Sequence, residues 1–61
     1  KIFIKRGSRG AVVSFVQEKG KVSQDGICGA KTVAAIRKYQ RKHGLSVDGI
    51  AGYDTLRRML S

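Results

Sequence analysis

The sequence predicts a small all-α fold, a three-helix bundle built from a duplicated helix-turn-helix unit. The 61 residues include eight glycines and no proline, a composition typical of helices joined by glycine turns. Apolar residues recur at helical spacing in three stretches. The pattern Asp-Gly-Ile-x-Gly-x-x-Thr occurs at residues 25–32 and again 23 positions later, at 48–55. A chain of this length makes one domain, residues 1–61.

The first expected helix spans residues 9–19, with Ser8 as its N-cap and Gly20 at its end. Ahead of it, Phe3 and Ile4 form an apolar lead-in that is expected to pack onto the body. The inner face is expected to carry four apolar residues: Val12, Val13, Phe15 and Val16. The outer face is expected to carry Arg9, Gln17 and Glu18.

The second expected helix spans residues 29–43, and Gly44 suits the left-handed position that follows a helix, with Leu45 as the accompanying apolar contact. Its inner face combines Val33, Ile36, Tyr39 and Gln40. The basic residues lie largely on another face: Lys31, Lys38, Arg41 and Lys42. A third helix is expected over residues 52–60, with an inner stripe of Leu56, Met59 and Leu60.

Self-alignment of the chain at an offset of 23 residues also matches Gln17 with Gln40, so each unit holds a helix end, a glycine turn and a helix start. Each part of the repeated motif has a structural interpretation. The aspartates are expected to accept hydrogen bonds from backbone N–H groups, and the next glycines to adopt a positive φ. Ile27 and Ile50 are expected to insert into the core. Gly29 and Gly52 are expected to permit close approach of the chain, and Thr32 and Thr55 to serve free helix N-terminal donors.

Charge is the most unusual bulk property of the chain, because thirteen Lys and Arg against four acids give a net charge of +9. Such a surface attracts polyanions, including nucleic acid, anionic lipid headgroups and bacterial wall polymers. The single cysteine excludes an internal disulfide, and one cysteine with one histidine argues against a metal site, so no cofactor is expected. Cys28 is interpreted as a small packing residue, and no catalytic triad or carboxyl pair is evident. No apolar run approaches the ~20 residues of a membrane span.

The stretch "VAAIRKYQRKHGLSVDGIAGYDTLRRML", residues 33–60, closely resembles the peptidoglycan-binding domain family. That family has an apolar-x-x-aromatic-Gln core followed by Gly-Leu-x-Val-Asp-Gly-x-x-Gly-x-x-Thr. The positions are filled here by Ile36, Tyr39, Gln40, Gly44, Leu45, Val47, Asp48, Gly49, Gly52 and Thr55. The earlier segments "RGSRGAVVSFVQ" and "DGICGAKT" are similar to the family's opening helix and first turn, so the resemblance covers residues 4–60.

The resemblance implies a non-catalytic three-helix module that binds bacterial peptidoglycan and targets an attached catalytic domain, such as that of a phage endolysin, to its substrate. The site of action would be the bacterial cell wall or periplasm, and a phage protein would be made in the host cytoplasm. Because the chain opens on Lys1 rather than Met, it is expected to be a piece of a longer protein, which the resemblance implies is a peptidoglycan hydrolase. Carried over by position, the wall-contacting residues are Asp25, Gly26, Ile27, Cys28, Gly29 and Thr32. The backbone N–H groups near Gly26 and Gly29 are expected to be open to a carboxylate or carbonyl of the ligand.

Nucleic-acid binding is the alternative that the residues leave open. A basic three-helix domain can place a helix against phosphates, and "TLRRML" sets Arg57 beside Arg58 on the last helix. The twin glycine turns have no explanation in that alternative, so no specific nucleic acid is expected as partner. Attachment to a membrane surface is a third possibility, which the lack of a helix with interfacial aromatics disfavours.

Overall fold

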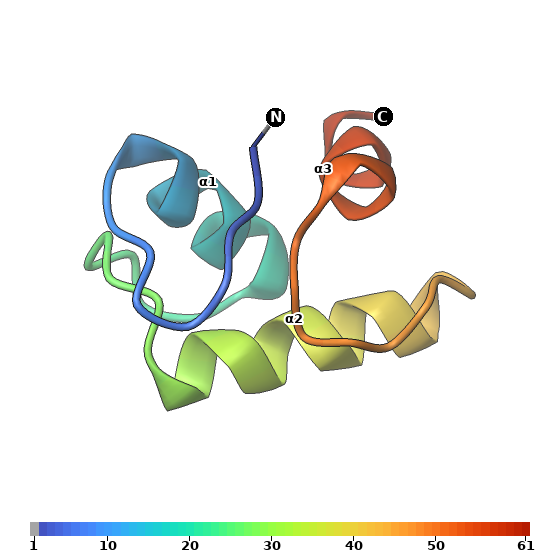
Figure 1. Cartoon of the computed structure of the whole chain (residues 1–61), viewed down its shortest axis with the longest axis horizontal. Helices are drawn as coiled ribbons and strands as arrows, with labels where there is room; N and C mark the ends of the chain where they lie inside the picture. The colour runs from blue at the N-terminus through green and yellow to red at the C-terminus, as the bar shows by residue number, and fades with distance from the viewer. Residues whose placement is uncertain (1) are drawn as a thin grey trace.

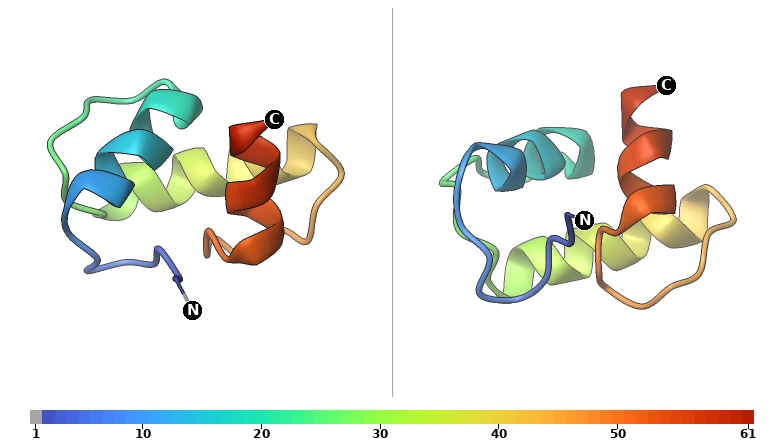
Figure 2. Two further views of the ribbon diagram at one scale, coloured as in Figure 1. Left: turned by 90° about the horizontal axis from the view of Figure 1, so that it is seen from above. Right: turned by 45° about the horizontal axis from the view of Figure 1, so that its top comes forward.

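Three helices and an extended N-terminal segment make up the structure, a computed structural model that describes residues 2–61 (Figure 1). The helices are α1 (Ala11–Gly20), α2 (Ala30–Lys42) and α3 (Tyr53–Leu60). The longest, α2, lies along one side of the molecule, and α1 and α3 both lie on the same side of it (Figure 2). The described residues contain no strand beyond two isolated bridges, so the predicted all-α three-helix fold is confirmed.

The N-terminal segment, residues 2–10, contacts both interhelical connections. We call residues 21–29, between α1 and α2, the first corner, and residues 44–52, between α2 and α3, the second corner. At the first corner Cys28 N–H donates to the Ser8 carbonyl at 2.8 Å, and Gly10 N–H donates to the Gly26 carbonyl at 2.9 Å. At the second corner Ile4 and Ala51 exchange two bonds of 3.0 and 2.8 Å. The segment therefore joins the two halves of the repeat.

The same pairing explains why α1 begins at Ala11 rather than at residue 9 as expected. Residues 8–10 are held in an extended pairing with the first corner, so they are not available to the helix. The N-cap is Gly10, with φ of 121°, and it has no side-chain cap. The expectation of Ser8 as N-cap was wrong: its Oγ accepts from Lys5 N–H at 3.1 Å.

The end of α2 forms the predicted glycine-terminated cap. His43 is the C-cap and Gly44 follows it with φ of 69°. Leu45 N–H donates to the Gln40 carbonyl at 2.8 Å, and Gly44 N–H donates to the Arg41 carbonyl at 3.4 Å. This pair of bonds is the Schellman arrangement, which satisfies carbonyls that the helix end leaves free.

The end of α1 repeats this cap 23 residues earlier, but without a glycine at the left-handed position. Lys21 takes φ of 60°, while Val22 N–H donates to the Gln17 carbonyl at 3.0 Å. Gly20 lies at the end of the helix as expected, but as its last helical residue, and the left-handed position falls on the next residue, Lys21. A Cβ on Gly20 would lie 3.1 Å from the Cβ of Ala35, so this glycine serves the close approach of α1 to α2.

Replacing Lys21 with Gly is therefore expected to stabilise the domain by about 0.5–1 kcal/mol, since a left-handed conformation costs a residue with a Cβ about 1–2 kcal/mol and the added backbone freedom offsets part of the gain. The measurement is the urea midpoint followed by circular dichroism. Gly44→Ala is the reverse control, because a Cβ at Gly44 meets no atom within 4 Å and any loss must come from its φ of +69°. Equal midpoints for Lys21→Gly and wild type would contradict this account.

The core lies between the three helices and is built from small and medium side chains. Its fully buried apolar members are Ile4, Val13, Val16, Cys28, Ile36, Ala51 and Met59. Phe15, Val33, Tyr39 and Leu56 pack against them while partly exposed. The expected inner faces of the helices are thus largely confirmed, with Val12 and Leu60 as errors, since both are exposed. Phe3 is also largely exposed, although its neighbour Ile4 is buried as expected.

In both corners the isoleucine side chain points away from the core. The expectation that Ile27 and Ile50 insert into the core was therefore wrong. Ile27 is 47% exposed, whereas the next residue, Cys28, is 1% exposed. Ile50 is likewise exposed and Ala51 is buried. Each pair lies in extended backbone, where successive side chains point to opposite sides, so burial of the fourth motif position turns the isoleucine outward.

Candidate functional site

The first corner is organised by one buried side chain, that of Gln17. Its Nε2 lies 2.8 Å from Asp25 Oδ1, 3.0 Å from the Ile27 carbonyl and 2.9 Å from Thr32 Oγ1. Its Oε1 accepts from Gly26 N–H at 3.0 Å. Gln17 was expected to face outward, and that expectation was wrong: it is 1% exposed. A polar group with this degree of burial is stable only because every hydrogen-bonding atom has a partner.

The second corner repeats this network around Gln40. Its Nε2 lies 2.9 Å from Asp48 Oδ1, 3.0 Å from the Ile50 carbonyl and 3.1 Å from Thr55 Oγ1. Its Oε1 accepts from Asp48 N–H at 3.1 Å and from Gly49 N–H at 3.0 Å. The repeated spelling of the sequence thus encodes a repeated amide-centred hydrogen-bond network.

Both aspartates and their glycines behave as the turn chemistry predicts. Asp25 Oδ1 also accepts from Ile27 N–H at 3.0 Å, and Asp48 Oδ1 accepts from Ile50 N–H at 2.9 Å. The glycine that follows each aspartate has φ of 75°. These are Asx turns, in which the carboxylate replaces a backbone acceptor and the glycine tolerates the left-handed conformation.

Both threonines and Gly29 depart from their expected roles, whereas Gly52 does not. Thr32 and Thr55 are buried and accept from the glutamine amides, and neither α2 nor α3 has a side-chain cap. A Cβ on Gly29 would meet no atom within 4 Å, so close approach does not explain that glycine. At Gly52 the expectation is confirmed, since a Cβ there would lie 3.3 Å from the Phe3 ring.

Among the six sequence-predicted wall contacts, the structure brings Asp25, Gly26, Ile27 and Thr32 together around Gln17. Asp25 and Ile27 are exposed, whereas Cys28 and Thr32 are buried, and burial raises the pKa of the Cys28 thiol. The backbone amides near Gly26 and Gly29 were expected to be open to a ligand, and this was wrong. Gly26 N–H donates to Gln17 Oε1, and Gly29 N–H donates to the Ile27 carbonyl.

Hydrogen bonding favours the charged form of both corner aspartates. The Gln17 amide and the Ile27 N–H hold the pKa of Asp25 below its usual value. The Ile50 N–H and the Gln40 amide do the same for the pKa of Asp48. Both carboxyls therefore give stability that is present above about pH 4 and is lost as the pH falls through the lowered folded-state pKa.

We accordingly expect the urea midpoint of the domain to fall between about pH 5 and pH 2.5. The control is the double variant Asp25→Asn, Asp48→Asn, whose amide oxygens accept the same bonds without titrating. That variant is expected to lose less stability over this range than the wild type. Parallel pH profiles for the two proteins would show that these carboxyls are not the groups responsible.

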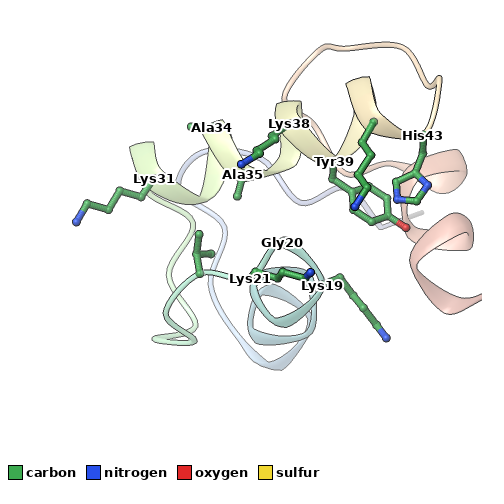
Figure 3. A pocket seen from close by; sticks show the side chains of 11 residues that line it. Lys19, Gly20, Lys21, Lys31, Ala34, Ala35, Lys38, Tyr39 and His43 are labelled. Carbon is green, nitrogen blue, oxygen red and sulfur yellow. The ribbon is translucent and has the colours of Figure 1, made fainter.

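The surface has a hollow that the sequence interpretation did not identify. A groove of about 650 Å³ lies between the C-terminal end of α1 and one side of α2 (Figure 3). Five lysines line it: Lys19, Lys21, Lys31, Lys38 and Lys42. Gly20, Val22, Ala34 and Ala35 also line it, together with Tyr39 and His43, whose ring centroids are 4.2 Å apart. The spacing of seven and then four residues between the lysines of α2 places them on one helix face, so the sequence identifies these residues but not the groove.

Two smaller hollows border the second corner rather than the first. One, of about 310 Å³, is lined by Phe3, Tyr53 and Asp54 along with Asp48 and Ile50. The other, of about 460 Å³, includes Gly49 and Arg37. None of the six sequence-predicted wall contacts lines any of these three hollows. Within residues 2–61, no three His, Cys, Asp or Glu side chains gather as a metal site would require, and no helix is long and apolar enough to cross a membrane.

Known proteins resemble this chain in both sequence and fold. A family model described as a putative peptidoglycan binding domain matches residues 11–59. The N-acetylmuramoyl-L-alanine amidase CwlL of Bacillus licheniformis is 45% identical over 47 residues, which are 74% of this chain and 13% of the amidase. The chain thus spans a small fraction of that relative.

Two solved structures share the fold. The SleB N-terminal domain superposes with a TM-score of 0.91 at 35% identity, over 97% of this chain and 89% of that one. A fused Zn-dependent amidase/peptidase/peptidoglycan-binding domain-containing protein from Clostridium acetobutylicum ATCC 824 gives a TM-score of 0.92 at 29% identity. That superposition covers 98% of this chain and 29% of the fused protein.

Proposed function

Because this chain belongs to the putative peptidoglycan-binding domain family, we propose that it binds bacterial peptidoglycan and holds an attached cell-wall hydrolase on its insoluble substrate. The module itself is a binding module and not a catalytic one. The observation that carries the proposal is the family match over residues 11–59, a region that includes both glutamine-centred corners. Retention on the substrate raises the local concentration of the catalytic domain without any new contact at the catalytic site.

The parent protein is proposed to be a peptidoglycan hydrolase that acts at the cell wall. Support comes from the amidase relative and from the fused amidase/peptidase neighbour, in which a similar chain is one part of a longer enzyme. The more specific expectation of a phage endolysin stays a prediction, since the amidase and the fused protein named above come from Bacillus and Clostridium. The identity of the catalytic domain encoded beside this module would test it.

The first corner is our proposed contact surface for the wall. Among the six residues predicted to contact the wall, Asp25 and Ile27 are the exposed ones, and Ile27 N–H donates to Asp25 Oδ1 at 3.0 Å. The hydrogen bonds within the corner use Asp25 Oδ1, so Oδ2 can accept from a sugar hydroxyl or peptide N–H. Ile27 supplies apolar contact. The buried Cys28 and Thr32 pack beneath the turn and help to fix the backbone from Gly26 to Gly29.

The duplication provides a matched test of this surface. The wild-type chain is expected to sediment with purified peptidoglycan, and Asp25→Asn with Ile27→Ser is expected to weaken retention about tenfold, the equivalent of ~1.4 kcal/mol. The control places the same changes at the equivalent positions, Asp48→Asn with Ile50→Ser. Circular dichroism checks that both variants remain helical.

The outcomes separate the site from the function. If both double variants lost retention on peptidoglycan to the same extent, the first corner would not be the contact surface. The proposal that the wild-type chain binds peptidoglycan would still stand. Failure of the wild-type chain to sediment with peptidoglycan would contradict the proposed function itself.

A further inference from the structure

The lysine groove between α1 and α2 has a charge distribution that folding does not require. All five of its charged lining residues are lysines, and none is an acid or an arginine. They lie on both of its walls: Lys19 is in the last turn of α1 and Lys21 directly follows that helix, while Lys31, Lys38 and Lys42 belong to α2. Like charges gathered around a concave surface repel one another, and the concavity concentrates their field.

The shape of the groove favours a thin, extended ligand. Gly20, Ala34 and Ala35 lie on its inner surface, and their small size leaves the space between the lysine stems open. Figure 3 shows Lys31 near one end and the Tyr39–His43 pair near the other. Lys31 and Lys42 are eleven positions apart on one helix, which corresponds to about 17 Å of helix axis. A single flexible chain fits such a groove, whereas a duplex is read by a convex helix that enters its groove.

The choice of lysine over arginine indicates the kind of anion. Arginine presents a rigid planar fork that pairs with a carboxylate or phosphate in one fixed geometry, whereas lysine is a point charge on a flexible stem whose rotatable donors can follow a mobile anion. The chain also has several arginines, including Arg37 and Arg41 on the same helix, but none of them lines this groove. The groove therefore suits negative charges that repeat along a flexible chain better than the isolated carboxylates of a peptide.

We propose that the lysine groove binds a phosphodiester-linked anionic polymer attached to the bacterial wall, as a second contact besides the one to peptidoglycan. This inference rests on the proposed function, which places the module at the wall. The two contacts act together: the groove supplies long-range, salt-dependent attraction, and the first corner supplies the contact with peptidoglycan. The two contact surfaces differ, since none of the six residues predicted to contact the wall lines the groove, although Lys21 and Val22 at the start of the first corner do.

The test compares walls that carry a covalently attached phosphodiester polymer with the same walls after hydrofluoric acid has removed it. The wild-type chain is expected to bind the intact walls about tenfold more tightly at low salt, and added salt is expected to abolish this preference. The variant Lys31→Gln, Lys38→Gln, Lys42→Gln is expected to lose the preference and to retain its binding to stripped walls. The slope of log affinity against log salt on intact walls is expected to fall by about two for the three lysines removed.

A matched variant removes the same charge elsewhere on the molecule. Arg9, Arg41 and Arg58 are exposed and lie outside the groove, so their triple replacement by Gln is expected to keep most of the preference for intact walls. If both triple variants lost the preference for intact walls to the same extent, the preference would depend on total surface charge and not on the groove, and the proposal would be overturned.

Two further outcomes would also overturn it. One is equal binding of the wild-type chain to intact and stripped walls, which contradicts the polymer contact but leaves the peptidoglycan contact standing. The other is a clear preference for single-stranded or duplex DNA over the soluble wall polymer at equal phosphate concentration, which would assign the groove to nucleic acid. Absence of binding to stripped walls is the separate result that contradicts the peptidoglycan function.

Discussion

Replacing Gln40 with Met is expected to destabilise the domain by about 3 kcal/mol or more. The Gln40 side chain takes part in five hydrogen bonds and is 1% exposed. Methionine keeps the length of the side chain but can satisfy none of these partners. The buried Gly49 N–H would lose its acceptor, and an unsatisfied buried group costs about 1–3 kcal/mol. A domain of this size has only about 3–9 kcal/mol of stability, so the variant is expected to be largely unfolded at 37 °C.

The measurement is urea unfolding followed by circular dichroism at 222 nm, with Gln24→Met as the control. Gln24 is exposed in the first corner, so the same change there is expected to alter stability by less than about 0.5 kcal/mol. A midpoint for Gln40→Met within error of the control would mean that the amide network has little role in holding the second corner.

Replacing Ile36 with Ala is expected to cost about 3 kcal/mol, the second large effect. Ile36 lies near the middle of α2, is 1% exposed and belongs to the central apolar cluster. Removal of three carbon atoms loses their burial and leaves a cavity, which a core of few, small side chains has little freedom to refill. The better helix propensity of alanine offsets a few tenths of a kcal/mol.

Ile27→Ala provides the matched control, because it removes the same atoms from a residue that is nearly half exposed. Its cost is expected to be below about 1 kcal/mol. Comparable losses for the two alanine variants, measured by the same urea titration, would place Ile27 in the core and contradict the outward orientation of the corner.

The helices and the duplicated plan could be predicted from local chemistry. The pattern of Ile36, Tyr39 and Gln40 fixes the inner face of α2, and Gly44 ends it at the expected place. The start of α1 could not be predicted in the same way, because Gly10 and its neighbours pair with residues that follow much later in the chain. A helix boundary set by such pairing leaves no local pattern in the sequence.

The corner network was within reach of the sequence but was only half recognised. Gln17 aligns with Gln40, whose inner position predicts the same for Gln17; the polarity of Gln17 predicts an outer position instead, and the structure shows that the alignment is the better guide. The orientation of the Ile27 side chain depends on whether Ile27 or the adjacent Cys28 is buried in the core. With Cys28 small enough to fit beneath the N-terminal segment, packing outweighs hydrophobicity at that position.

The lysine groove shows a second limit of prediction from sequence, which is the shape of a site formed by two helices. Lys31, Lys38 and Lys42 share a helix face that the sequence predicts to be a solvated surface. Only the close approach of Gly20 to Ala35 brings the end of α1 alongside them and turns that face into one wall of a groove. A concave site formed by two helices depends on tertiary geometry, so composition and spacing identify its residues without revealing its shape.

The N-terminal segment has a practical consequence for transplanting this module onto other enzymes. The family match begins at residue 11, yet Ile4, Ser8 and Gly10 form backbone bonds to both halves of the repeat. A fusion joint placed at the start of the match would remove the N-terminal segment, whose hydrogen bonds join the two halves of the repeat. Engineered chimaeras should therefore retain the stretch upstream of α1 and introduce their linker ahead of Ile4.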